Sequence, residues 1–223
     1  MKGKKILIVG GSTGIGLALA KRVSEDGGEV LIASRSAFDK QASIRSQPYL
    51  ESCTCYSVDI TVESEIKNLL EKIGKIDHLI FTVKSPLIVS PFLELDLKEV
   101  RHAFDTKFWG QYSFAKLAHE YINDGGSIVF SSGTLGKRPY NGYSTLSTIS
   151  GAVESLGKAL AIELAPIRVN TVSPGFKTLK ELEEKIPLGL GSDSQISNSY
   201  LFLMNDSYIT GTTIVSDGGA MLV

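Results

Sequence analysis

Short apolar runs alternate with helical patterns along the whole chain, and this alternation limits the possible folds more than any other feature. The runs are rich in Ile and Val and are apolar at successive positions, as expected of parallel strands buried on both faces. Parallel neighbours need crossover helices between them. The pattern therefore predicts an α/β fold, with one doubly wound parallel sheet of about seven strands and helices on both faces. The expected strands are 5–9, 30–33, 55–58, 78–82, 127–130, 168–172 and 213–215.

Five helices are expected between these strands, and two of them carry start signals. Thr61 is a good N-cap residue with Glu63 in the turn that follows. Asp96 fits a capping box with Glu99. Pro166 cannot continue a helix and is expected to stop the fourth one. The expected helices span 14–26, 62 onward, 97–123, 143–165 and 195–204.

The composition is that of an ordinary globular protein, with 43% apolar and 21% charged residues. A chain of 223 residues can bury a substantial core, and this one shows no linker or internal repeat, so we expect one domain over 1–223. The net charge of −1 gives no reason to expect a nucleic acid or an anionic membrane as partner. No apolar run approaches a membrane span or a signal-peptide core, so a cytoplasmic protein is expected.

Metal and disulfide chemistry are not expected from this sequence. The two cysteines, Cys53 and Cys55, alternate along an expected strand, so both side chains should face one way. A metal site needs more ligands than this pair, and the three histidines, His78, His102 and His119, are scattered along the chain. We interpret the cysteines as small, half-buried residues and predict no metal site.

A glycine cluster follows the first expected strand, in the stretch V-G-G-S-T-G-I-G that ends at Gly16. Gly10 would let the chain turn sharply out of the strand, and Gly14 and Gly16 would let the backbone approach a pyrophosphate. The N–H groups at the start of the helix would then face the phosphates. Because a strand and a helix flank the cluster, we favour a dinucleotide site over the alternative of a simple tight turn.

Further motifs follow in order along the chain. V-D-I stands at 58–60, I-R-V-N-T-V-S-P-G at 167–175 and Y-I-T-G-T-T-I-V-S-D-G-G at 208–219. Taken singly, Asp59 could cap a loop and Gly218 with Gly219 could turn the chain. Together with the G-x-x-x-G-x-G spacing, the ordered set resembles the short-chain dehydrogenase/reductase family over essentially the whole chain. The resemblance implies a Rossmann sheet, a nicotinamide dinucleotide, carbonyl–alcohol chemistry and Asp59 beside the adenine amino group.

The end of the second expected strand bears on the choice of cofactor. It reads I-A-S-R-S, with Arg35 between two serines and no acidic residue. A carboxylate here would bind a ribose 2′-hydroxyl, whereas a cation suits a 2′-phosphate. We therefore predict NADP(H), the alternative being that Arg35 is a solvated surface residue. The expected cofactor-binding residues are Gly10, Ser12, Thr13, Gly14, Ile15, Gly16, Ser34, Arg35, Ser36, Asp59, Ile60, Thr82, Pro174, Gly175 and Thr178.

The resemblance also implies four catalytic positions: a serine after the fifth strand, a Y-x-x-x-K pair and a helix asparagine. Ser132 matches the serine and would donate to the substrate oxygen, and Tyr143 matches the tyrosine and would exchange a proton with that oxygen. The lysine position is Ser147 and the asparagine position is Lys107. The family's N-N-A-G after the fourth strand reads F-T-V-K at 81–84. Two of the four catalytic positions therefore differ from the family.

Lys107 is the residue that we hypothesise to supply the missing positive charge. A tyrosine hydroxyl has an ordinary pKa of about 10, and a close cation can lower it by about one to three units. If the helix keeps its register, the flexible lysine stem could reach toward Ser147 and Tyr143. The alternative is that Lys107 extends into solvent or pairs with Asp105 or Asp124.

The leading functional hypothesis is an NADP(H)-dependent oxidoreductase that interconverts a carbonyl and an alcohol on a small organic substrate. The alternatives are an NADP(H)-binding sensor or partner without redox activity, and a non-redox lyase or isomerase on the same scaffold. A short substrate lid is expected near 176–190. Small residues on the helix 143–165, among them Ser150 and Gly151, together with the resemblance, imply a homodimer or homotetramer.

Overall fold

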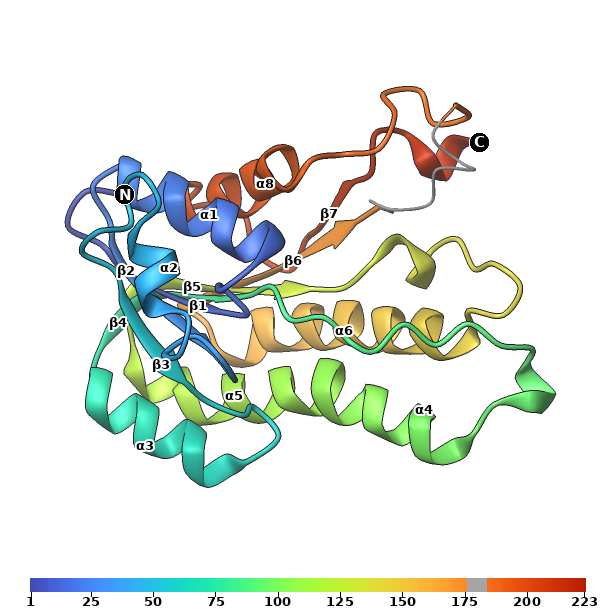
Figure 1. Ribbon diagram of the computed structural model, residues 1–223, viewed down its shortest axis with the longest axis horizontal. Coiled ribbons are helices and arrows are strands. Elements are labelled where there is room, and N and C mark those ends of the chain that lie inside the picture. The colour runs from blue at the N-terminus through green and yellow to red at the C-terminus, as the bar shows by residue number, and fades with distance from the viewer. Residues whose placement is uncertain (176–183) are drawn as a thin grey trace.

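The computed structural model describes residues 1–175 and 184–223 of the chain. Seven parallel strands form one sheet in the order β3-β2-β1-β4-β5-β6-β7, with helices on both faces (Figure 1). The predicted fold class is therefore confirmed. The strands are β1 Lys5–Val9, β2 Glu29–Ser34, β3 Thr54–Ser57, β4 Ile76–Phe81, β5 Ile122–Ser131, β6 Arg168–Pro174 and β7 Thr213–Ser216.

The helices follow the predicted order with two differences. The short α2 was not predicted, because five residues are too few to show a helical period. The expected helix 97–123 is divided by a π-helical turn, Asp105–Trp109, and gives way to β5 at Ile122. The α-helices are α1 Gly14–Glu25, α2 Gln41–Arg45, α3 Glu63–Ile73, α4 Leu97–Phe104, α5 Gly110–Ala118, α6 Ser144–Glu163 and α8 Asp193–Asn205. The 3-10 turns are Phe92–Glu94, His119–Tyr121, Thr134–Gly136 and Ala220–Leu222.

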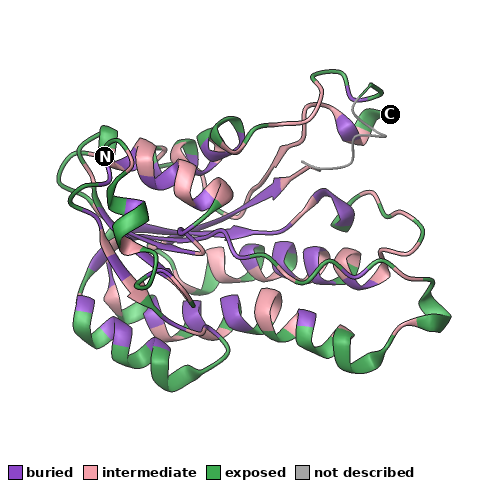
Figure 2. Ribbon diagram, viewed as in Figure 1, coloured by how far each residue is buried: buried purple, intermediate pink, exposed green. Residues whose placement is uncertain are grey.

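The sheet is buried on both faces, which explains why its strands read as continuous apolar runs. Successive side chains of a strand point to opposite faces. Leu7 and Val9 pack into the layer with α3, α5 and α6, and Ile6 and Ile8 pack into the layer with α1 and α8. Figure 2 shows the buried strands at the centre and exposed residues on the outer sides of the helices. Replacing an apolar strand residue with a polar one would therefore remove apolar contacts from one of the two core layers.

The two predicted helix caps have different outcomes. Asp96 caps α4, with its carboxylate accepting from the Lys98 backbone N–H at 2.7 Å, although Glu99 makes no reciprocal bond among the described residues. Thr61 does not cap α3. Its N–H and hydroxyl donate instead to the Asp59 carboxylate at 2.9 and 2.7 Å, which draws Thr61 into a local turn and leaves Val62 at the cap.

A complete capping box stands at α8, where none was predicted. The Ser192 hydroxyl accepts from the Gln195 backbone N–H at 3.2 Å, and the Gln195 side chain accepts from the Ser192 N–H at 2.9 Å. The S-x-x-Q spacing was the available sequence signal. The helix consequently begins at Asp193, two residues before the predicted start.

The two cysteines face the same way as predicted, with their Sγ atoms 3.9 Å apart and both thiols free. They are fully buried and not half-buried as expected, because a helical layer covers this face of the sheet. Burial raises the pKa of the Cys55 thiol to about 12, and the neighbouring Cys53 adds to the rise. Within 1–175 and 184–223, no group of three or more His, Cys, Asp and Glu residues is placed to hold a metal ion. No helix in these two ranges is long and apolar enough to cross a membrane.

His78 is a buried histidine in the middle of the sheet. It is 4% exposed, and its Nδ1 lies 2.8 Å from the Ser127 hydroxyl on the neighbouring strand β5. Burial, with the nearby Arg168 charge adding, lowers the pKa of His78 from its ordinary 6.5 to about 4. The folded protein therefore holds this imidazole neutral at a pH where the unfolded chain would protonate it.

This difference predicts acid sensitivity of the fold. The pKa of His78 is lower in the folded protein than in the unfolded chain. The contribution of neutral His78 to the free energy of unfolding is therefore fully present above pH 6.5 and is lost as the pH falls toward 4. Between pH 7 and pH 5 the free energy of unfolding should fall by about 2 kcal/mol. Urea unfolding of His78→Gln should show a much smaller fall. The matched variant at the exposed His119, His119→Gln, should behave like the wild type, and an equal fall in all three proteins would contradict the assignment.

Candidate functional site

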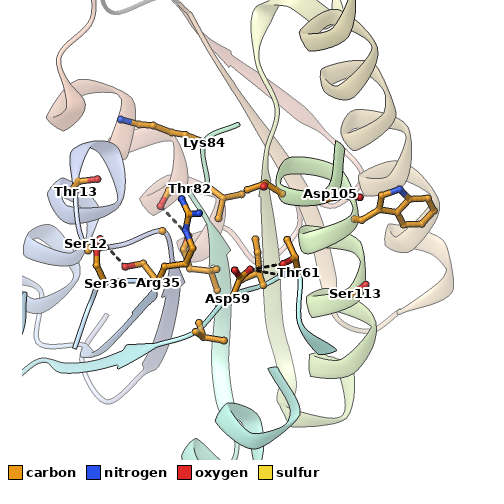
Figure 3. A pocket seen from close by; sticks show the side chains of 18 of the residues that line it. Ser12, Thr13, Arg35, Ser36, Asp59, Thr61, Thr82, Lys84, Asp105 and Ser113 are labelled. Carbon is orange, nitrogen blue, oxygen red and sulfur yellow. Dashed lines mark hydrogen bonds between the residues drawn. The ribbon is translucent and has the colours of Figure 1, made fainter. Parts of the chain in front are cut away.

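A cavity of about 570 Å³ opens beyond the carboxyl ends of β1, β2, β3 and β4 (Figure 3). The strand order reverses between β1 and β4, and ligands of doubly wound sheets bind at such a switch point. Of the residues predicted to bind a cofactor, those that line the cavity are Gly10, Ser12, Thr13, Ser34, Arg35, Ser36, Asp59, Ile60 and Thr82. The fold thus brings together residues from four separate strand ends.

The other predicted cofactor residues lie elsewhere. Gly14, Ile15 and Gly16 form the first turn of α1, which begins at the cavity edge after Thr13. Pro174 and Gly175 stand at the end of β6 and are not among the cavity-lining residues. Thr178, with most of the predicted lid, lies outside the described residues. Contact between these residues and a cofactor stays a prediction.

Two glycines allow the loop after β1 to lie close to Thr82 at the end of β4. Gly10 has a φ of +88°, and a Cβ there would lie 2.9 Å from the Thr82 carbonyl carbon. A Cβ on Gly16 would lie 2.3 Å from the Thr82 hydroxyl oxygen and 2.6 Å from the Gly10 carbonyl oxygen. All three distances are below van der Waals contact, so only glycine lets the loop, the helix and the segment after β4 approach this closely.

The start of α1 offers backbone donors to an anion. Thr13 occupies the N-cap but its side chain makes no capping hydrogen bond, and the first turn holds no acidic residue. The first N–H groups of a helix have no partner within the helix, and the helix dipole places partial positive charge there. This end of the cavity therefore suits a phosphate group.

The end of β2 carries the second group of polar residues. The Ser34 hydroxyl donates to the Ser12 hydroxyl at 2.9 Å, and Arg35 lines the cavity (Figure 3). No carboxylate among the described residues forms an ion pair with Arg35. The Thr61 backbone N–H lowers the pKa of Asp59, and the Arg35 charge adds to that effect. The guanidinium is thus available to an anionic ligand.

Ser132 faces the protein interior. It is 2% exposed, and its hydroxyl donates to Glu154 Oε1 at 3.0 Å. Glu154 Oε2 also lies 3.8 Å from Lys137 Nζ. Ser132 is not among the cavity-lining residues. Donation from Ser132 to a substrate oxygen stays a prediction, and it requires the hydroxyl to leave Glu154.

Sequence reasoning did not single out Glu154. The available sequence signal was that Glu154 lies on the same helix face as Ile149, Ser150 and Val153, which α6 buries. A carboxylate is rarely buried without a partner, and here Ser132 and Lys137 supply it. The expected serine is therefore tied to a charged network that only the packing of α6 against β5 reveals.

Tyr143 stands at the start of α6, as the sequence predicted. It occupies the N-cap, its backbone carbonyl accepts from the Ser147 N–H at 2.9 Å, and its ring packs edge-on against Tyr140. In the turn that follows, the hydroxyls of Ser144, Thr145 and Ser147 are buried and have no hydrogen-bond partner within the described ranges. Buried polar groups are normally paired, so this turn is a place where a ligand or a water can bind.

Lys107 lies in the π-helical turn between α4 and α5, a type of turn that is frequent at functional sites. The fully buried Gln111 side chain donates to the Lys107 carbonyl and, at 3.3 Å, to the Ser131 carbonyl, which ties the turn to β5. Burial, with the Lys84 charge adding, lowers the pKa of the half-buried Lys107 to about 8. Neither Asp105 nor any other described carboxylate pairs with its ammonium, so the ion-pair alternative is not supported.

The lowered pKa of Lys107 predicts a pH-dependent cost to stability. The penalty on the charged form is fully present below pH 8 and disappears as the pH rises to the ordinary 10.5. Lys107→Met should therefore raise the free energy of unfolding at pH 7 by about 1–2 kcal/mol, allowing for the hydration that a half-buried ammonium keeps. The gain should vanish near pH 10. Lys67→Met, at an exposed site on α3, is the control, and an equal effect of both variants would contradict the assignment.

Comparisons with known proteins identify the family of this chain. A family model described as enoyl-(acyl carrier protein) reductase matches residues 9–221. Short-chain dehydrogenase/reductase ATR9 of Stachybotrys chlorohalonatus is 32% identical, over 100% of this chain and 98% of that protein.

Solved structures agree as well. A small-chain dehydrogenase in complex with NADPH is 33% identical with a TM-score of 0.86, over 100% of both chains. The MalC Reductase/Diels-Alderase from Malbranchea aurantiaca is 27% identical with a TM-score of 0.91, over 100% of this chain and 97% of that one. With a family match that spans nearly its whole length and full-length relatives, the chain belongs to the short-chain dehydrogenase/reductase family.

Proposed function

We propose that this protein is an NADP(H)-dependent oxidoreductase that interconverts a carbonyl and an alcohol on a small organic substrate. The observation that carries the proposal is Arg35, which stands in the cavity between Ser34 and Ser36 with no carboxylate at that strand end. A guanidinium with neighbouring hydroxyls suits a 2′-phosphate. The similar dehydrogenase solved in complex with NADPH supports the same cofactor.

The residues that line the cavity fit the adenine and phosphate parts of such a dinucleotide. Arg35 would bind the 2′-phosphate, Asp59 the adenine amino group, and the first turn of α1 the diphosphate, which Gly10 and Gly16 allow to approach. Pro174 would lie near the nicotinamide end. When bound, the nicotinamide supplies or accepts the hydride.

Proton transfer is assigned to the region around the start of α6. Tyr143 would exchange a proton with the substrate oxygen, and Ser132 would donate to that oxygen after releasing Glu154. Ser147 cannot supply the positive charge that the family's lysine gives. Lys107 would take that role, since a pKa of about 8 keeps most of its amine charged at neutral pH.

Two other functions are alternatives to this proposal. The engagement of Ser132 by Glu154, and the serine at 147, favour an NADP(H)-binding sensor or partner without redox activity. The name of the similar MalC protein joins a reductase to a Diels-Alderase, so a non-redox reaction on this scaffold is the other alternative to test. These alternatives differ from the leading proposal in whether NADPH is consumed.

The deciding experiment measures the loss of reduced nicotinamide absorbance with a panel of ketones and quinones, together with identification of the product. The oxidoreductase proposal expects NADPH consumption matched by alcohol or hydroquinone formation. Turnover should fall by at least about a hundredfold in Lys107→Met, and unchanged turnover would remove Lys107 from the mechanism. Tight NADPH binding with no consumption across the panel would favour the sensor.

The exposed surface of the helices supports a homodimer or homotetramer. Leu93 and Leu97 are large apolar residues that are 95% and 62% exposed. On α6, a Cβ at Gly151 would meet no atom within 4 Å, so the helix is open to close approach by a second helix. Light scattering after size-exclusion chromatography tests this proposal, and a monomer at micromolar concentration would contradict it.

A further inference from the structure

Lys84 reaches a part of the cavity that its position in the sequence does not suggest. It follows the end of β4 by three residues, yet its Nζ lies 3.4 Å from the point where a Cβ on Gly14 would stand. Figure 3 shows its side chain extending from β4 toward the helix start that carries Thr13. Lys84 and Thr13 both line the cavity. A flexible cation thus stands over the backbone donors at the start of α1.

The carboxylate of Asp193 lies near the same point at Gly14 as the Lys84 ammonium. The Asp193 carboxylate oxygens lie 3.6 and 3.8 Å from the same point at Gly14. Asp193 is the first residue of α8, which packs against α1. A carboxylate this close to Gly14 would oppose a phosphate at the start of α1, since like charges repel across a partly desolvated site. Among the described residues, Lys84 is a cation near the same point at Gly14.

We propose that Lys84 binds the diphosphate of the dinucleotide, at the start of α1, and there offsets the negative charge of Asp193. The proposal rests on the NADP(H) site proposed above and adds a residue to it. The N-N-A-G motif to which 81–84 corresponds has no cation, so this contact belongs to this chain rather than to the motif. A lysine acts on phosphate as a mobile point charge, which matches a flexible side chain over a loop.

Lys84 and Arg35 then recognise different phosphates of one ligand. Arg35 stands just after β2, and the Lys84 ammonium lies near Gly14, at the start of α1. Fragments of the cofactor separate the two contacts. ADP carries the 5′-diphosphate alone, and adenosine 2′-monophosphate carries the 2′-phosphate alone. Each fragment should therefore depend on one of the two cations.

Calorimetric titration of the whole protein with NADPH and these two fragments tests the proposal. Lys84→Met should weaken NADPH and ADP about tenfold and leave adenosine 2′-monophosphate within about twofold. Arg35→Met should show the opposite preference between the fragments. Lys84→Arg should restore ADP binding, and Asp193→Asn should strengthen it severalfold, since it removes the opposing charge.

The possible failures can be told apart. If wild-type protein binds the ligands and Lys84→Met binds ADP equally well, the assignment of Lys84 is overturned while the proposed function stands. If Lys84→Met weakens both fragments alike, the effect is general and the assignment is also overturned. If wild-type protein binds neither NADPH nor a fragment, the proposed function and this inference fall together. Thermal unfolding of each variant is the control for stability. Because Lys84 is exposed, its variants should unfold at the wild-type temperature.

Discussion

Replacement of Gly16 by alanine is expected to destabilise the protein by about 3 kcal/mol and to abolish dinucleotide binding. The added Cβ would stand 2.3 Å from the Thr82 hydroxyl oxygen, 2.6 Å from the Gly10 carbonyl oxygen and 2.8 Å from the Gly11 Cα. Two of these atoms are backbone, so no rotamer change relieves the clash. The loop or α1 must shift, and with it the donors that would face the diphosphate.

Urea unfolding measures the loss of stability, and titration with NADPH measures the loss of binding. Gly191→Ala is the matched control, because a Cβ there meets only Ile196 side-chain carbons at 3.5 and 3.6 Å, which is ordinary contact. The control should keep both stability and binding. A Gly16→Ala protein with wild-type stability would contradict this close contact, because it would show that a Cβ fits between α1 and Thr82.

Replacement of Arg35 by methionine is expected to weaken NADPH binding by about thirtyfold to a hundredfold and to leave NADH binding nearly unchanged. Arg35 lies in the cavity without a carboxylate partner among the described residues, so its charge is available to the 2′-phosphate. NADH lacks that phosphate. The loss should therefore be confined to one cofactor, which a general disturbance of the cavity would not produce.

Equilibrium titration with both cofactors measures this change in preference. Arg101→Met is the control, because Arg101 is an exposed arginine on α4 outside the cavity. It changes the net charge by the same amount and should leave both affinities within about twofold. Equal weakening of NADPH and NADH in Arg35→Met would mean that Arg35 supports the shape of the cavity and not the recognition of a 2′-phosphate.

Much of the fold could be predicted from the sequence because both sides of the sheet are covered. Ile6 and Leu7 each need an apolar partner on a different face, so a strand between two helical layers reads as a continuous apolar run. The π-helical turn at Asp105–Trp109 could not be predicted, since its residues fit a continuous helix. The Gln111 side chain bonds both the Lys107 carbonyl in this turn and the Ser131 backbone on β5. Tertiary contacts decided that detail.

The cofactor cavity was predictable for a topological reason. Residues such as Gly10, Arg35 and Asp59 each follow a parallel strand, and the carboxyl ends of neighbouring parallel strands meet at one edge of the sheet. Long side chains were not predictable in the same way. Lys84 crosses from β4 to α1, which no sequence spacing indicates.

The catalytic region was predicted less fully, because the direction of a side chain depends on its packing. Ser132 occupies the expected place after β5, but its hydroxyl points to Glu154 on α6. The pKa of Lys107 is lowered, and the sequence could not indicate this, because the causes are burial and the charge of Lys84, which are properties of the folded chain. The family resemblance indicated these positions, and the fold determined what each side chain contacts.

The cavity beyond β1, β2, β3 and β4 is proposed to hold a dinucleotide with a 2′-phosphate, and every assigned role depends on that cofactor. Side-by-side calorimetric titrations of the wild-type protein with NADPH and NADH test it most directly. We expect saturable binding of one NADPH per chain, at least about tenfold tighter than NADH. Equal or tighter binding of NADH, or no saturable binding of either cofactor, would contradict the proposal.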